Sequence, residues 1–200
     1  EGVLGTLSRH ADRTFGVIGI HDINNVYEGG PPSPWFTLFT SMFIHGGWLH
    51  LIGNMLFLWV FGDNLENRLG RIKYLFFYLI SGLFATACQV AVNLNTGIPT
   101  IGASGAVAGV LGGYFVLFPN AQIRTLIFFF FITVVSIPAW ILIGVWIIMQ
   151  FFNGFISLGG EFADGVAYWA HIGGFIAGFL ITLTFVGLAG FKRVFHLGYK

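Results

Sequence analysis

The chain alternates long apolar segments with short polar connections from about residue 35 onward. The apolar segments cover about 47–61, 74–92, 104–118, 123–152 and 168–188, and an apolar lead-in over 35–44 precedes the first. A membrane-spanning helix needs roughly 20 apolar residues, and lipid offers no partners to an unpaired backbone, so we expect helices. The longest segment must tilt or bend, and Pro138 is the expected place for a bend. The pattern predicts an all-α integral membrane protein with five spans.

The two ends of the chain are more polar than its middle. The longest apolar stretch before residue 35, residues 15–20, is too short to span a bilayer. We therefore expect residues 1–34 to form an external interfacial loop region. Residues 35–190 should form the membrane domain, and residues 191–200 a cytoplasmic tail.

Composition supports a membrane protein. Apolar residues make up 56% of the chain, charged residues 8%, and the mean hydropathy is +0.83. A soluble domain carries about 25% charged residues because its surface faces water. The net charge of +1 gives no broad positive field, so we expect the lipid bilayer as a partner and no nucleic acid.

The basic residues orient the spans. Seven of the nine lie at one side if the segments alternate: Arg68, Arg71, Lys73, Arg124, Lys192, Arg193 and Lys200. The opposite connections, 93–103 and 153–167, contain none. Because cytoplasmic loops carry the excess of Lys and Arg, the first, third and fifth segments should run from outside to inside.

Polar side chains begin these three segments. His50 and Asn54 lie in the first segment, Ser104 opens the third, and His171 lies near the start of the fifth. Parallel helices would bring all four to a similar shallow depth. His50 and Asn54 are four residues apart and share one helix face. Buried polar groups in membrane helices indicate function by default, whereas Gln89 approaches an outer loop where water can solvate it.

Small residues follow both Ser104 and His171 at four-residue spacing. The two stripes are Gly105, Gly109 and Gly113, and Ala170, Gly174 and Gly178. Such stripes let helices approach closely enough for a serine–histidine hydrogen bond, although ordinary packing around a structural histidine produces the same pattern.

A serine beside a histidine suggests hydrolysis. His171 would take the Ser104 proton, and the helix N-terminus at Ser104 would favour developing negative charge. Side-chain donors on His50 and Asn54 could stabilise the same oxyanion. No carboxylate lies near enough in these helices to orient His171, so we expect a Ser-His dyad.

A metal site is the competing arrangement. His45 and His50 are five residues apart, about 140° around a helix, and could not share a ligand face there. The chain has neither a His-Glu-x-x-His pattern nor a cluster of Cys and His. We therefore expect no metal and no cofactor.

Three motifs in order carry a family resemblance. They are the run from His45 to Asn54 (HGGWLHLIGN), Gly102 to Gly105 (GASG) and Ala170 to Gly174 (AHIGG), and Glu66 to Gly70 (ENRLG) adds a fourth match. From about residue 35 to 188 the chain resembles the rhomboid intramembrane serine proteases.

The resemblance implies roles for individual residues. Ser104 would be the nucleophile and His171 the general base and then acid, while His50 and Asn54 with the Ser104 N–H would bind the oxyanion. His45 would be structural. Substrates would be single-span membrane proteins cut near the outer face, the fourth segment would gate their entry, and loop 153–167 would cap the site.

The chain departs from the family pattern in two respects that bear on the site. The family core has six membrane helices, and the first has no counterpart among the five segments counted above. Some members carry an aromatic residue four positions after the serine, which packs on the histidine, and this chain has Ala108 there.

Two further questions stay open at this level. The resemblance is also compatible with a catalytically silent rhomboid-like binding or scaffold subunit of a larger membrane assembly. A transporter or channel fits less well, because the polar groups gather toward one side of the membrane. We expect a prokaryotic cell (inner) membrane, with the active site near its external face.

Overall fold

The computed structural model describes residues 34–92, 100–128, 132–158 and 165–197. Its elements, in chain order, are α3 (Pro34–Thr40), the 3-10 turn η1 (Ser41–Phe43), α4 (Trp48–Phe57), the π-helical turn η2 (Leu58–Gly62), α5 (Asp63–Leu69), α6 (Arg71–Val92), α7 (Ser104–Leu117), β1 (Gln122–Phe128), β2 (Ile132–Pro138), α8 (Ala139–Ser157) and α9 (Tyr168–Leu197). The predicted external loop, apart from its last residue, lies outside the described part.

Four of the five predicted spans occur as helical segments over most of their expected length. Among the described residues, α6, α8 and α9 up to Gly187 are each long and apolar enough to cross a membrane. The lead-in helix and the continuous run from α4 to α5 pass the same test together, with a bend of 92° between them. The shorter α7 has 14 residues, so it is only about 21 Å long against a hydrocarbon core of about 30 Å.

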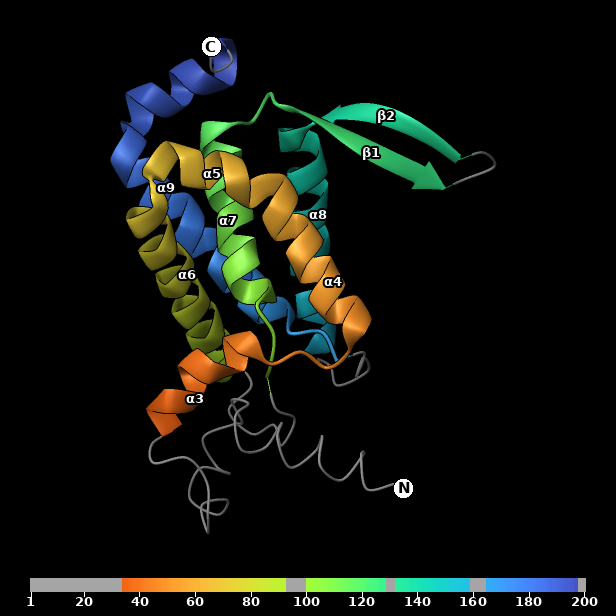
Figure 1. The fold of residues 1–200 in the computed structure, drawn as a ribbon, viewed down its shortest axis with the longest axis vertical. Helices are drawn as coiled ribbons and strands as arrows, with labels where there is room; N and C mark the ends of the chain where they lie inside the picture. Colours follow the sequence, from red (N-terminus) through yellow and green to blue (C-terminus); the bar gives the residue numbers. More distant parts are fainter. Residues whose placement is uncertain (1–33, 93–99, 129–131, 159–164, 198–200) are drawn as a thin grey trace.

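The prediction of one helix over residues 123–152 was wrong in its first half. Residues 122–128 and 132–138 form the two antiparallel strands of a hairpin, in which Gln122 pairs with Pro138 and Phe128 with Ile132. This stretch is rich in β-branched and aromatic residues, which favour strands, and Pro138 then caps the start of α8. Open strand edges are not tolerated in hydrocarbon. The two strands lie at the end of the bundle that also holds α5, which carries Arg68, and the start of α6, which carries Arg71 (Figure 1).

The structure adds detail to three segments that flank the predicted spans. The connection 62–73 is helical through Leu69 and turns at Gly70, whose φ is +81°. Helix α9 breaks at Gly187 but continues to Leu197, so the predicted cytoplasmic tail is helical over 191–197. The predicted cap 153–167 is helical up to Ser157, and residues 159–164 lie outside the described part.

Helix α7 forms the centre of the bundle. Nearly all of its residues are buried, and it packs most closely against α9, with α4, α6 and α8 around them (Figure 1). Helices α4, α7 and α9 begin at the same end of the bundle, whereas α6 and α8 run the other way (Figure 1). The predicted convergence of the three helix starts therefore holds.

The glycine stripes allow the contact between α7 and α9. A Cβ atom added at Gly174 would collide with the carbonyl oxygen of Gly105, and one at Gly178 with that of Gly109. Backbone atoms cannot move aside as a flexible side chain can. The close approach that the stripes predicted is therefore present in the fold, and it holds the starts of α7 and α9 together.

We expect Gly178→Ala to destabilise the bundle by about 1–3 kcal/mol, because the added methyl must push two backbones apart. Gly144→Ala is the matched control, since nothing lies within 4 Å of the corresponding position on α8. Alanine favours helix over glycine, so the control should melt at or slightly above the wild-type temperature. Equal melting temperatures for both variants in detergent would contradict the prediction.

Candidate active site

The turn before α7 sets the position of Ser104. Gly102 has a φ of +115°, a conformation that side-chain-bearing residues rarely adopt, and its N–H donates to the carbonyl of Ser41 at 2.8 Å. A Cβ atom at Gly102 would lie only 2.6 Å from Cε1 of His50. Glycine is required here both by the turn and by the imidazole ring that lies against it.

Ser104 and His171 lie within hydrogen-bond distance. The Oγ atom of Ser104 is 2.8 Å from Nε2 of His171, and both side chains are half-buried. Ser104 is the first residue of α7 and His171 lies in the first turn of α9, so the close packing of these helices creates the contact. The N–H groups at the start of α7 have no partners within the helix, so they are available as donors next to the serine.

The other nitrogen of His171 also has a partner. Its Nδ1 atom is 2.8 Å from Oε1 of Gln150, a buried residue of α8. Gln150 was not among the predicted site residues, although a lone amide within an apolar membrane helix was a usable signal. A dyad was predicted because no carboxylate was available, and an uncharged amide occupies the third position instead.

An aromatic ring packs beside His171 from an unexpected helix. Trp146 lies one turn before Gln150 on α8, and its ring centroid is 5.8 Å from that of His171. The chain has Ala108 at the position where the family resemblance leads us to expect an aromatic residue in some members. The position of Trp146 therefore supplies from α8 the aromatic contact that α7 lacks.

Gln89 is buried, contrary to the prediction that water solvates it. Its Oε1 atom accepts a hydrogen bond from the backbone N–H of Ala170 at 3.1 Å. Because Ala170 directly precedes His171, this bond fixes the first turn of α9 beside the candidate base. The same N–H also donates to the carbonyl of Ala167 at 3.0 Å, so Gln89 is its second acceptor.

The candidate oxyanion donors lie on α4. His50 is half-buried against Gly102, two residues before Ser104. Asn54, one turn further on, is 6% exposed, and its Nδ2 atom has no hydrogen-bond partner. A buried amide without a partner is unusual and needs an explanation, which a ligand oxygen would provide.

His45 lies outside the helix, so the predicted separation of His45 and His50 by 140° around one helix was wrong. Helix α4 begins at Trp48, and the rings of His45 and His50 meet edge to face with centroids 5.2 Å apart. Nε2 of His45 accepts the N–H of Ala103 at 3.5 Å. Burial, with a smaller effect of nearby His50, lowers the pKa of His45, which keeps the ring neutral and able to accept this bond. Among the described residues, no three His, Cys, Asp or Glu side chains form a metal-binding group.

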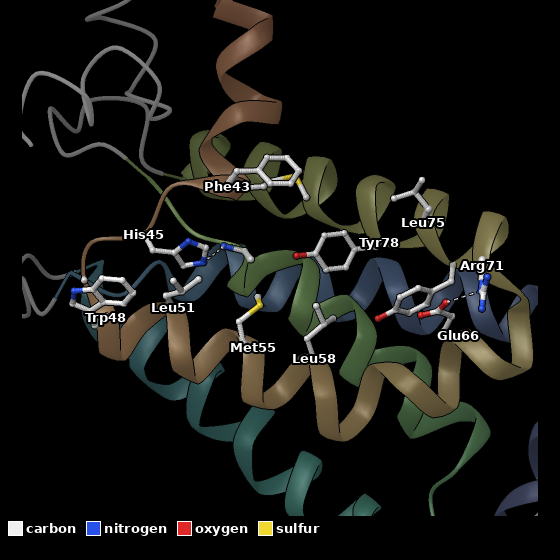
Figure 2. A pocket seen from close by; sticks show the side chains of 14 residues that line it. Phe43, His45, Trp48, Leu51, Met55, Leu58, Glu66, Arg71, Leu75 and Tyr78 are labelled. Carbon is white, nitrogen blue, oxygen red and sulfur yellow. Dashed lines mark hydrogen bonds and ion pairs between the residues drawn. The ribbon is translucent and has the colours of Figure 1, made fainter.

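A large cavity adjoins the site without including it. Its volume is about 840 Å³, and it runs between α4 and α6 from Trp48 to Arg71 (Figure 2). Its walls are mostly apolar, with the Glu66–Arg71 ion pair at one end and His45 near the other. Its lining includes His45 and Ala103 but neither Ser104 nor His171, so it does not contain the serine–histidine pair.

Comparison with known proteins identifies the family. The Rhomboid domain model matches residues 32–188 of the chain. The chain belongs to the rhomboid family. It is 34% identical to RHOMBOID-like protein 4 of Arabidopsis thaliana over 169 residues, which cover 84% of this chain and 38% of that protein. It is also 34% identical to the mitochondrial Rhomboid protein 1 of Saccharomyces cerevisiae over 145 residues, or 70% of this chain and 39% of that protein.

A third rhomboid relative is named as a protease. The chain is 29% identical to Rhomboid-like protease 5 of Toxoplasma gondii over 174 residues, which cover 84% of this chain and 18% of that protein. This chain thus spans well under half the length of all three. The family and the helices make it a multi-pass membrane protein. Mitochondrial and chloroplastic relatives give no support to the prediction of a prokaryotic cell membrane in particular.

Proposed function

We propose that this rhomboid chain is an intramembrane serine endopeptidase that hydrolyses peptide bonds of transmembrane substrate proteins. The observation that carries the proposal is the 2.8 Å contact between Ser104 Oγ and His171 Nε2 at the start of two closely packed helices. A serine hydroxyl is a weak nucleophile until a neighbouring base takes its proton. The family match and the protease among the relatives support the same activity.

The reaction follows from the atoms at the site. Ser104 Oγ attacks the scissile carbonyl carbon while its proton passes to Nε2 of His171. The oxyanion receives hydrogen bonds from the first-turn N–H groups of α7 and from the side chains of His50 and Asn54. His171 then gives its proton to the leaving amine, and water hydrolyses the acyl-enzyme by the same steps in reverse.

The position of the site in the bundle suggests where substrates are cut. The site lies at the end of α7 opposite the hairpin and α5, which carry Arg124 and Arg68 (Figure 1). If the basic end is cytoplasmic, the site lies toward the external face. The substrates are single-span membrane proteins. Because α7 is shorter than the hydrocarbon core is thick, its first residue, Ser104, lies below the bilayer surface, and the scissile peptide bonds must reach it there.

Labelling with a fluorophosphonate probe tests the proposal without knowledge of the natural substrate. The wild-type protein in detergent should be labelled, and both Ser104→Ala and His171→Ala should abolish labelling, because the probe requires a base-activated serine. A folded wild-type protein that resists the probe would favour the alternative, a catalytically silent binding or scaffold subunit of a membrane assembly.

A further inference from the structure

The imidazole of His171 is bonded on both sides, and its second partner has no role in the reaction described above. Gln150 Oε1 lies 2.8 Å from Nδ1, and Ser104 Oγ lies 2.8 Å from Nε2. Gln150 is 8% exposed, so water has little access to compete for this bond. We propose, on the basis of the proposed protease function, that Gln150 is a positioning residue that holds His171 in its base-competent tautomer.

The tautomer matters because a neutral imidazole has one donor and one acceptor nitrogen. With Oε1 of Gln150 toward the ring, Nδ1 carries the proton and Nε2 keeps its lone pair for the Ser104 hydroxyl. If Nδ1 lost its acceptor, the proton could move to Nε2, which would then donate to Ser104 and could not act as a base. The amide acceptor thus selects the reactive form of the site.

The placement of an amide on α8 supports a functional role. The buried residues of this helix are Ala139, Ile143, Gln150 and Gly154, which form one stripe toward the bundle. The other three are small or apolar, as packing alone requires. A polar amide in a membrane helix is costly unless it is paired, and here its oxygen is paired with the candidate base.

An uncharged acceptor suits this position. During acylation the Ser104 proton moves to Nε2, so His171 becomes an imidazolium while its Nδ1–H stays bonded to Gln150. The proton on Nε2 then leaves with the amine product, and no proton is transferred to Gln150. A carboxylate in its place would stabilise the imidazolium more strongly but would bury a permanent charge beside lipid, which is expensive.

The kinetic test compares Gln150→Met with Gln150→Glu. Methionine has a similar length and no strong acceptor, so kcat should fall by about 10- to 100-fold, part of what a general base contributes, with KM changed less than about threefold. Glutamate restores an acceptor oxygen and should retain clearly more activity than methionine. Met149→Leu is the matched control, because Met149 is the neighbouring residue on α8, is 54% exposed, and should keep wild-type turnover.

A second measurement reads the tautomer directly and needs no turnover. In protein labelled with ¹⁵N-histidine in detergent micelles, the His171 resonances, assigned by their loss in His171→Ala, should show Nδ1 protonated. Gln150→Met should shift them toward a mixture of tautomers, and Gln150→Glu should not. Unchanged tautomer and kcat in folded Gln150→Met would overturn the role of Gln150. A wild-type protein with the expected tautomer but no turnover would instead contradict the protease function alone. If Gln150→Met does not fold, the test falls to Gln150→Glu, in which a mixture of tautomers would overturn the role of Gln150.

Discussion

Ser104→Ala should reduce cleavage of a transmembrane substrate by about 10⁶-fold, the loss typical when the nucleophile of a serine protease is removed. The Oγ atom is the only atom of Ser104 that can form the acyl-enzyme, and the rate that remains without it comes from the oxyanion donors and substrate binding. The measurement is turnover of a single-span substrate in detergent or proteoliposomes. His171→Ala should cost a similar factor, and the double variant should cost no more than either alone, because the two residues act as a unit.

Ser81→Ala is the matched control for this loss. Ser81 is a buried serine of the same bundle, and its Oγ atom has no hydrogen-bond partner, so its removal should leave turnover within about twofold. Comparable residual activity in Ser104→Ala and the control would contradict the assignment of Ser104. Additive losses in the Ser104 and His171 double variant would show that the 2.8 Å contact is not a catalytic pair.

The serine, the histidine and their contact could be predicted because several independent features of the sequence agree. Ser104 and His171 open helices that the loop charges make parallel, and the glycines behind them demand close packing. Each glycine that would collide with a backbone oxygen, such as Gly174 or Gly178, is a local signal with a long-range consequence. The depth and proximity of the pair therefore follow from residues near each of them.

Gln150 and Trp146 could not be placed in the same way. Their contacts with His171 depend on the rotation of α8 about its axis, and this helix has apolar residues on every face. Only tertiary packing selects the side that faces α9. The strands before α8 could not be predicted either. Hydrophobicity indicates burial or lipid contact, but it does not distinguish the strands that form over 122–128 and 132–138 from a helix.

Asn54→Leu should lower kcat by about 100- to 1000-fold, which is the effect of removing one oxyanion donor. Asn54 is buried and its Nδ2 atom has no partner in the free protein. A donor that is unpaired in the resting site and paired in the tetrahedral intermediate gives its whole stabilisation to the transition state. The effect should therefore appear in kcat, with little change in KM.

The same substitution should leave stability unchanged or raise it, because a buried donor without a partner is replaced by an apolar side chain of similar size. Gln89→Leu is the comparison, since that buried amide accepts from the Ala170 N–H, and losing a hydrogen bond of this kind costs about 0.5–1.5 kcal/mol. Melting of both variants in detergent separates the two amides. A large loss of stability in Asn54→Leu with normal kcat would show that Asn54 stabilises the fold. Lost turnover in a variant that melts no lower than wild type would show that the unpaired Asn54 amide contributes to catalysis and not to stability.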